Sequence, residues 1–247
     1  MSDAAPVVRL AGVQKWFRAG GAPKSVYGAL TNLFRGPEAA GAFLALDGVS
    51  FDVAPGEKIG VIGDNGAGKT TLLRTIAGLY RPSAGSVDVR GEIALVTGLG
   101  IGMLDELTVE ENIYLYGAIN GMGRDEIRAR LPEIIDWAEL APFRTAKLKT
   151  LSTGMHSRLA FSAVRCVGAD VYLLDEVLSA GDRNFRLKCL AVFDAWKASD
   201  RAFVVAAHEL EFVRKFCDKA VWLQKGRQMD FGPAEAIVER YIAARQG

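Results

Sequence analysis

Eight consecutive residues combine glycines, a lysine and a threonine in a spacing suited to phosphate binding. They run from Gly63 to Thr70, read GDNGAGKT and fit the pattern G-x-x-x-x-G-K-[ST] in full. The glycines let the backbone turn tightly around an anion, so that loop N–H groups can face the phosphates. The Lys69 ammonium would neutralise charge on the β- and γ-phosphates, and the Thr70 hydroxyl could ligate Mg²⁺. The sequence therefore predicts a phosphate-binding loop between a strand and a helix.

Two neighbouring carboxylates form a second candidate site. Asp175 and Glu176 follow four apolar residues, Val171–Leu174, that are typical of a buried strand. In open α/β sheets ligands bind at the carboxyl ends of the strands. We expect Asp175 to hold Mg²⁺, directly or through water, and Glu176 to polarise the attacking water. Many strands end in a solvated acidic turn, but the position of this pair after the phosphate-binding loop favours the catalytic interpretation.

A third motif, Leu151–Met155 (LSTGM), begins a predicted helix shortly before the carboxylate pair. The Ser152 hydroxyl and the open backbone at Gly154 could bind phosphate at the helix N-terminus. The alternative is an ordinary helix cap formed by Ser152 or Thr153. Without the other motifs, the helix cap is the preferred interpretation.

Strand-like and helix-like segments alternate along the chain, which predicts an α/β fold with a mainly parallel sheet. Strands are expected at residues 7–13, 44–53, 58–63, 87–89, 92–96, 171–174, 202–206 and 220–223. Helices are expected at residues 70–79, 184–198, 209–217 and 233–245. Residues 107–167 show a helical pattern with stops at 121–123 and 141–142, so they are expected to form an inserted helical block.

Residues 18–42 interrupt the alternation with glycines and prolines. Within them, residues 25–34 (SVYGALTNLF) place several apolar side chains near one helical face. The segment is either a short amphipathic helix inside an inserted loop or a surface excursion with one packed turn.

Composition excludes several classes of protein. Among 247 residues, 30 Lys and Arg oppose 29 Asp and Glu, and this balance excludes a chain that works mainly as an electrostatic trap for nucleic acid. The 50% hydrophobic content excludes disorder, and no apolar run is long enough for a membrane span. No secretion signal is expected from the N-terminal residues. The three widely spaced cysteines predict neither disulfides nor zinc, but buried, reduced thiols.

Together the motifs resemble the ATP-binding subunits of ABC transporters. LSTGM is similar to the signature motif of that family, usually LSGGQ, and the resemblance extends over residues 7–231. It implies a P-loop NTPase of the ABC ATPase fold, with a mainly parallel core sheet, an antiparallel β part and an inserted α-helical subdomain. It also implies a head-to-tail dimer that holds ATP and Mg²⁺ between the loop of one chain and the signature motif of the other.

The resemblance divides the chain as one nucleotide-binding domain, 1–247. Its parts would be a RecA-like catalytic core with the antiparallel β part at 1–97 and 168–247, a helical signature subdomain at 98–167 and an inserted loop at 18–43 that could hold a gate helix.

The resemblance also assigns roles to individual residues. His208 matches the switch histidine that contacts the γ-phosphate, and residues 179–182 (SAGD) occupy the D-loop, which is usually SALD. Phe17, or Trp16 beside it, takes the place of the aromatic that stacks on adenine, with simple core packing as an equal alternative. Lys69, Glu176 and His208 are then the expected catalytic residues, and Thr70 and Asp175 the expected metal ligands. The expected nucleotide contacts are Phe17, Gly63, Asp64, Asn65, Gly66, Ala67, Gly68, Lys69, Thr70, Thr71, Ser152, Thr153 and Gly154.

Departures from the family pattern narrow the branch. The glutamine that usually contacts magnesium and water is missing, and Gly98 takes its approximate place, so coordination there must come from elsewhere, such as backbone or water. The glutamine-free VTGLGIG before ELTVEEN, the GM of the signature before HSRLAFS, and DEVLSAGD resemble ATPases that export bacterial surface polysaccharides. These include exporters of O-antigen, capsule and teichoic acid, some of which carry an extra helix in the early insertion. This favours a helix at 25–34.

The expected partners are a separate membrane permease and a second copy of this chain, at the cytoplasmic face of the plasma membrane, without nucleic acid. Residues 107–116 and the loop before them would grip a cytoplasmic helix of the permease. One alternative is an ABC ATPase for another cargo, such as a lipid, drug or nutrient. Another is a soluble ABC protein of translation or DNA repair, but those proteins usually carry two cassettes or long coiled coils, and this chain has neither.

Overall fold

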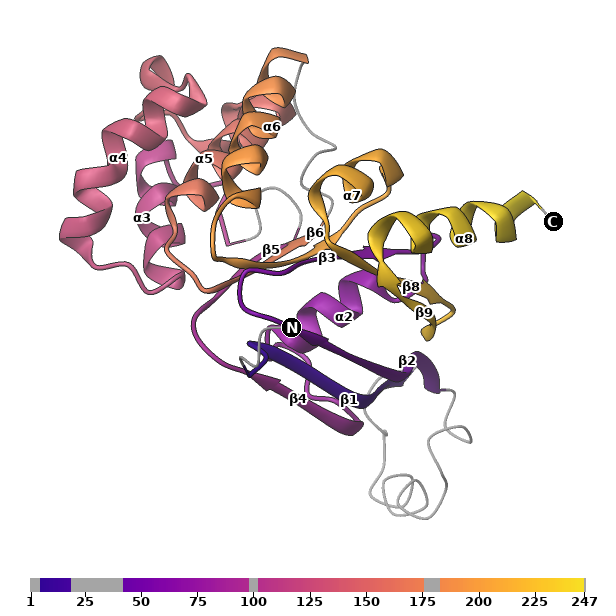
Figure 1. The fold of residues 1–247 in the computed structure, drawn as a ribbon. Helices are drawn as coiled ribbons and strands as arrows, with labels where there is room; N and C mark the ends of the chain where they lie inside the picture. The colour runs from indigo at the N-terminus through magenta and orange to yellow at the C-terminus, as the bar shows by residue number, and fades with distance from the viewer. Residues whose placement is uncertain (1–4, 19–41, 98–101, 176–182, 247) are drawn as a thin grey trace, which may run out of the picture.

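The computed structural model describes residues 5–18, 42–97, 102–175 and 183–246 (Figure 1). In these residues one sheet of nine strands runs through the molecule in the order β4-β1-β2-β9-β8-β3-β7-β6-β5. The strands are β1 (Val8–Arg18), β2 (Ala42–Val53), β3 (Lys58–Ile62), β4 (Ala84–Val89), β5 (Ile93–Thr97), β6 (Val171–Asp175), β7 (Ala202–Ala206), β8 (Lys219–Gln224) and β9 (Arg227–Pro233).

The centre of the sheet is parallel, as the alternating pattern predicts. Strands β5, β6, β7, β3 and β8 all pair in parallel, and every residue of β3, β6 and β7 is buried. Such strands are covered on both faces and are therefore continuously apolar. The register places Ala206 beside both Val61 and Asp175. The segments that follow β3, β6 and β7 consequently emerge at one edge of the sheet, where α/β proteins bind ligands.

Three antiparallel pairs and one parallel pair, β2 with β9, complete the sheet, which confirms the expected fold class. Strand β1 pairs with β2 and β4, and β8 pairs with β9. The sequence pattern did not predict β9, because Asp230, Gly232 and Pro233 all have low strand propensity. The strand forms through the preceding turn, in which Lys225 and Gly226 both have positive φ (49° and 82°). That is the geometry of a tight two-residue hairpin, and it forces the chain back along β8.

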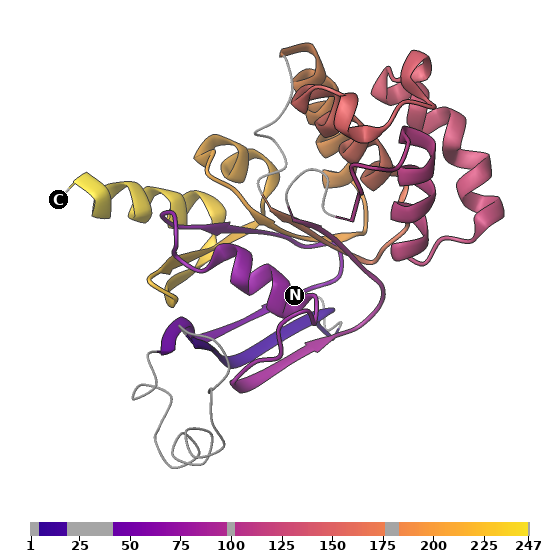
Figure 2. The same ribbon diagram turned by 180° about the vertical axis from the view of Figure 1, so that it is seen from behind.

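The described residues contain seven α-helices. They are α2 (Lys69–Ile76), α3 (Val109–Ile119), α4 (Arg124–Ala138), α5 (Thr153–Cys166), α6 (Arg183–Lys197), α7 (Leu210–Phe216) and α8 (Ala234–Gln246). Helix α2 lies between the parallel strands and the antiparallel part, with contacts to β2 and β4 on one side and to β5, β6 and β7 on the other (Figures 1 and 2). Helices α3, α4, α5 and α6 gather at one end of the molecule.

The helical block is less continuous than its sequence pattern suggests. Between Ala138 and Thr153 the chain forms only two short 3₁₀ turns, Ala141–Phe143 and Leu148–Thr150, where the sequence predicted helix apart from the stop at 141–142. Apolar side chains of this connection, such as Leu140, are buried in the core of the block. They resemble a helical stripe in sequence, but they anchor a connecting segment.

The three cysteines, Cys166, Cys189 and Cys217, are free and buried, as expected. Burial raises the pKa of each thiol, that of Cys189 to about 12. Within the described ranges, none of the helices has both the length and the apolar character needed to cross a bilayer. The predicted helix at 25–34 lies outside the described residues.

Candidate nucleotide-binding site

The phosphate-binding loop connects β3 to α2, and two of its glycines are sterically required. Gly63 has a φ of 149°, and a Cβ on it would lie 2.2 Å from the carbonyl oxygen of Leu223 in β8. Gly68 has a φ of 106°, and a Cβ there would lie 2.7 Å from the carbonyl oxygen of Ala45 in β2. The Gly226 N–H also donates to the Ala67 carbonyl at 3.0 Å. The loop is therefore fixed against two strands, β2 and β8, and against the turn between β8 and β9.

Helix α2 begins without a side-chain cap. Its N-cap is Gly68, no side chain bonds to the first turn, and the first turn contains no acidic residue. The first N–H groups of a helix have no partner within the helix, and together with the helix dipole they favour an anion. The N-terminus of α2 thus has the features of a phosphate site.

The Lys69 side chain folds back over this loop. It is only 6% exposed, and its ammonium donates to the carbonyl oxygens of Gly63 (2.9 Å) and Asp64 (3.2 Å). A positive charge is thereby held beside the N-terminus of α2, in the position expected for a group that pairs with phosphate oxygens.

The two expected metal ligands lie together. The Thr70 hydroxyl donates to Oδ2 of Asp175 at 2.6 Å, although the residues lie 105 positions apart. Asp175 is buried at the carboxyl end of β6. Mg²⁺ prefers oxygen ligands and commonly takes one or two from the protein. A hydroxyl and a buried carboxylate beside a phosphate-binding loop fit that preference.

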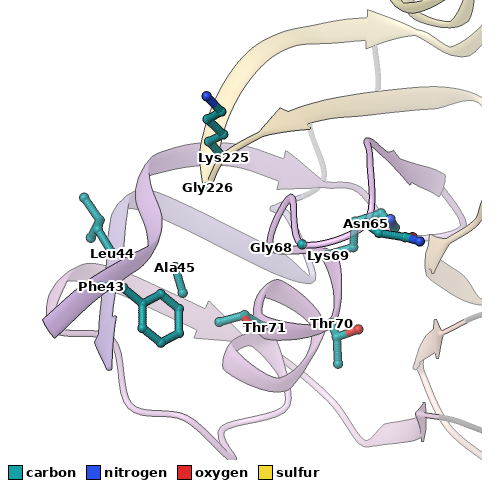
Figure 3. A pocket seen from close by; sticks show the side chains of 11 residues that line it. Phe43, Leu44, Ala45, Asn65, Gly68, Lys69, Thr70, Thr71, Lys225 and Gly226 are labelled. Atoms are coloured by element: carbon teal, nitrogen blue, oxygen red, sulfur yellow. The ribbon is translucent and has the colours of Figure 1, made fainter. Parts of the chain in front are cut away.

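A cavity of about 440 Å³ opens beside the loop (Figure 3). Its walls come from β2, from the loop with the start of α2, and from the β8–β9 turn. The lining residues are Phe43, Leu44, Ala45, Asn65, Gly66, Gly68, Lys69, Thr70, Thr71, Lys225 and Gly226. In Figure 3 the Phe43 ring lies on the same side of the cavity as Thr71. Lys69 lies with Asn65 at the opposite end.

Phe43 is the aromatic residue of this cavity, and the sequence did not single it out. It is 57% exposed, and its ring stacks on Phe17 with centroids 5.5 Å apart. Phe17 in turn meets the edge of Tyr80 at 5.2 Å. Phe17 thus lies behind Phe43 and does not itself line the cavity, so its contact with adenine stays a prediction. An aromatic at the start of a strand, directly after an insertion, was the available signal.

A second cavity, of about 420 Å³, lies on the other side of the loop. It is lined by Gly63, Asp64 and Asn65, by Ala207, His208 and Leu210 after β7, and by Tyr241 and Arg245 of α8. The structure therefore brings His208 to the phosphate-binding loop, and its contact with the γ-phosphate stays a prediction. Tyr241 and Arg245 of α8 also line this cavity, although no sequence motif indicated them.

The signature segment lies apart from both cavities. Ser152 is the N-cap of α5, and its hydroxyl accepts a hydrogen bond from the Met155 N–H at 3.3 Å. Within one chain the cap interpretation of Ser152 therefore holds. Among the described residues that line the two cavities, none comes from 152–154. Glu176, Gly98 and residues 179–182 lie outside the described residues.

Comparison with known proteins identifies the family. The model of the ABC transporter family matches residues 46–179. The chain is 38% identical over 202 residues to the O-antigen export system ATP-binding protein RfbB of Klebsiella pneumoniae, covering 82% of each chain. It is 39% identical over 197 residues to the teichoic acids export ATP-binding protein TagH of Bacillus anthracis, covering 80% of this chain but only 36% of TagH.

Among solved structures, a dimeric post-hydrolysis state of an ATP-binding cassette bound to ADP and Pi has the same fold, with a TM-score of 0.72. It is 23% identical in sequence, and the match covers 92% of this chain and 98% of that chain. The family model, the extent of the match to RfbB and the shared fold agree with the geometry of the loop. The chain belongs to the ABC transporter family, in the branch whose curated relatives are ATP-binding proteins of O-antigen and teichoic acid export systems.

Proposed function

We propose that this chain is the ATP-binding and ATP-hydrolysing subunit of an ABC exporter for a bacterial cell-surface polysaccharide or lipid-linked glycan, of the O-antigen or teichoic acid type. The observation that carries the ATPase part is the contact of Thr70 with buried Asp175 beside the uncapped start of α2. The relatives in O-antigen and teichoic acid export support the cargo.

The cavity beside the loop offers groups suited to the triphosphate and to the base of ATP. The triphosphate would lie against the N-terminus of α2 and the Lys69 ammonium, and the base would lie against the exposed ring of Phe43. Thr70 and Asp175 would hold Mg²⁺, which when bound neutralises phosphate charge and orients the phosphate oxygens.

The residues at the β-strand ends would then carry hydrolysis. Glu176 would orient and polarise the attacking water, and His208, which borders the loop, would stabilise charge on the γ-phosphate. The facing copy of the chain would close the site with Ser152, Thr153 and Gly154. The absence of residues 152–154 from the lining of the two described cavities supports this role for a second copy. Hydrolysis would gate opening of the dimer.

Transport requires a separate permease in the membrane. In this proposal residues 98–167 form the helical subdomain that contacts it, and residues 1–97 and 168–247 form the catalytic core. Leu104 and Ile119, at the two ends of the segment that contains α3, expose 56% and 61% of their surface. Exposed large apolar side chains favour a protein contact in this region, at the cytoplasmic face of the membrane.

The decisive experiment uses Glu176→Gln, which should bind ATP but barely hydrolyse it. The variant is expressed in the native cell, and lipid-linked glycans are extracted from the cytoplasmic side. Accumulation of polymer inside, with loss from the surface, supports the exporter. Unchanged glycans, together with an ATP-trapped dimer of the purified variant, would leave the ATPase intact and assign another cargo. Failure of the chain to sediment with membranes that contain the permease would favour a soluble ABC protein.

A further inference from the structure

Helix α8 reaches the phosphate-binding loop with two side chains. The Tyr241 hydroxyl donates to Oδ1 of Asp64 at 3.0 Å, and the Arg245 guanidinium lies 3.4 Å from the same oxygen. The guanidinium also lies over the Tyr241 ring, 5.4 Å from its centroid. Asp64 and Tyr241 are 177 positions apart. We call this three-residue contact the α8 clasp.

The Tyr241 end of the clasp is fixed in the core. Tyr241 is 5% exposed, and its ring meets the edge of Trp222 on β8 with centroids 5.6 Å apart. On the same helix Ile237 and Val238 are completely buried, and α8 lies along β8 beside β3 (Figure 1). Burial raises the pKa of Tyr241, so its hydroxyl stays protonated and can donate. A buried tyrosine on a packed helix is a rigid donor.

The backbone of Asp64, at the other end of the clasp, helps to hold the Lys69 side chain. The backbone carbonyl of Asp64 accepts hydrogen bonds from the Ala67 N–H at 3.0 Å and from the Lys69 ammonium at 3.2 Å. The side chain and the carbonyl belong to one residue, so contacts that hold the Asp64 side chain also restrict the carbonyl that orients the lysine. The clasp connects the core of the C-terminal helix to the charge that faces the phosphates.

The clasp also reduces the repulsion between the Asp64 carboxylate and a bound triphosphate. Asp64 places a carboxylate in a loop that attracts anions, and a mobile carboxylate there would repel the triphosphate. Tyr241 and Arg245 both act on one oxygen of this group, so they fix its direction and offset its charge. We propose that Tyr241 and Arg245 are positioning residues for nucleotide binding, which hold Asp64 and, through its carbonyl, Lys69. This inference rests on the proposed function.

The expected effects are moderate and fall on binding. Arg245 and Asp64 are a solvent-exposed pair, so Arg245→Gln should weaken MgATP binding by about two- to fivefold. Tyr241→Phe removes a hydrogen bond to a charged group and should weaken binding by about threefold to tenfold. Both variants should raise KM and leave kcat within about twofold, because the clasp acts before the chemical step.

Matched variants separate positioning from general stability. Arg240 lies on the same helix, and its guanidinium pairs with Asp230 at 2.7 Å. Arg240→Gln therefore removes an ion pair of α8 without touching the loop, and it should bind MgATP like the wild type. Arg245→Lys should recover most of the affinity. In an Asp64→Asn background, Arg245→Gln should have no further effect, because the charge partner is gone.

The test is calorimetric titration of full-length protein with MgATP, combined with steady-state ATPase kinetics. The clasp is supported if Kd and KM rise in Tyr241→Phe and Arg245→Gln but not in Arg240→Gln, and if Arg245→Gln has no further effect in the Asp64→Asn background. Wild-type affinity in both clasp variants, or an Arg245→Gln effect that persists beside Asp64→Asn, would overturn it while the ATPase assignment stands. Failure of the wild type to bind MgATP would overturn the proposed function, and the clasp with it.

Discussion

Replacement of Gly63 by alanine tests whether the shape of the phosphate-binding loop is enforced by its neighbours. The new methyl would lie 2.2 Å from the carbonyl oxygen of Leu223, a residue that is completely buried in β8. The φ of Gly63 is 149°, which side chains rarely adopt. Gly66 offers a matched control, because it lies in the same loop with a φ of 78° and a Cβ there would meet nothing within 4 Å.

Gly63→Ala has two destabilising effects, backbone strain and overpacking, whereas Gly66→Ala has only the first. Both strain the backbone, at a cost of about 1–2 kcal/mol for a residue in the left-handed region. Only Gly63→Ala also forces the loop and β8 apart by about 1 Å, and overpacking of this kind costs about 1–3 kcal/mol. We therefore expect a loss of about 4 kcal/mol for Gly63→Ala and about 1.5 kcal/mol for Gly66→Ala. For a chain of this length these losses lower Tm by about 12 °C and 4 °C.

Urea unfolding and thermal melts of the ligand-free proteins measure this difference. The Gly63 carbonyl accepts a hydrogen bond from the Lys69 ammonium at 2.9 Å, so Gly63→Ala should also weaken MgATP binding. Equal stability of the two variants would refute the reasoning, because it would mean that the contact with Leu223 does not constrain the loop. A Gly63→Ala variant that is as stable as the wild type would refute it more strongly.

Three further predictions concern the site and the core. Asp175→Asn keeps an oxygen that can accept from Thr70 but loses the charge, so the MgATPase rate should fall at least about a hundredfold with little change in Tm, and a retained rate would contradict the metal assignment. Phe43→Ala should raise the Kd for MgATP about fivefold, by loss of stacking on the base, and an unchanged Kd in titration would exclude this contact. Burial raises the pKa of Cys189 to about 12, so its reactive thiolate form is scarce at pH 8. Ellman's reagent should therefore label the native protein slowly and the urea-unfolded protein rapidly at all three cysteines, and fast native labelling would contradict the burial.

Local patterns predicted the parts of the site that depend on local backbone geometry. The phosphate-binding loop needs glycines at fixed offsets between a strand and a helix, and that requirement is visible in eight residues. The apolar runs that become β3, β6 and β7 are equally easy to recognise in the sequence, because strands buried on both faces are apolar at nearly every position. Strand β9 was missed because the turn before it, and not its own propensity, determines its conformation.

The remaining features depend on contacts between distant residues, which no local window contains. Phe43 lines a cavity only because β2 lies beside the β8–β9 turn in the fold. Tyr241 and Arg245 meet Asp64 only because α8 packs along β8, next to the strand that precedes the loop. A tyrosine and an arginine four positions apart on an amphipathic helix have no feature in sequence that separates them from ordinary core and surface residues.

The starts of helices α2 and α5 show how a site divided between two chains can assemble in order. At α2 the N-cap is Gly68, which has no side chain, so the first N–H groups are available to a ligand from the outset. At α5 the Ser152 hydroxyl already accepts from the Met155 N–H. In this bond the Ser152 hydroxyl uses only an acceptor lone pair, so its O–H can still donate to a phosphate oxygen while the cap stays in place. Under the proposed function, ATP therefore binds first at the open start of α2 in a single chain, and the Ser152 hydroxyl of the second chain then donates to a phosphate that is already in place.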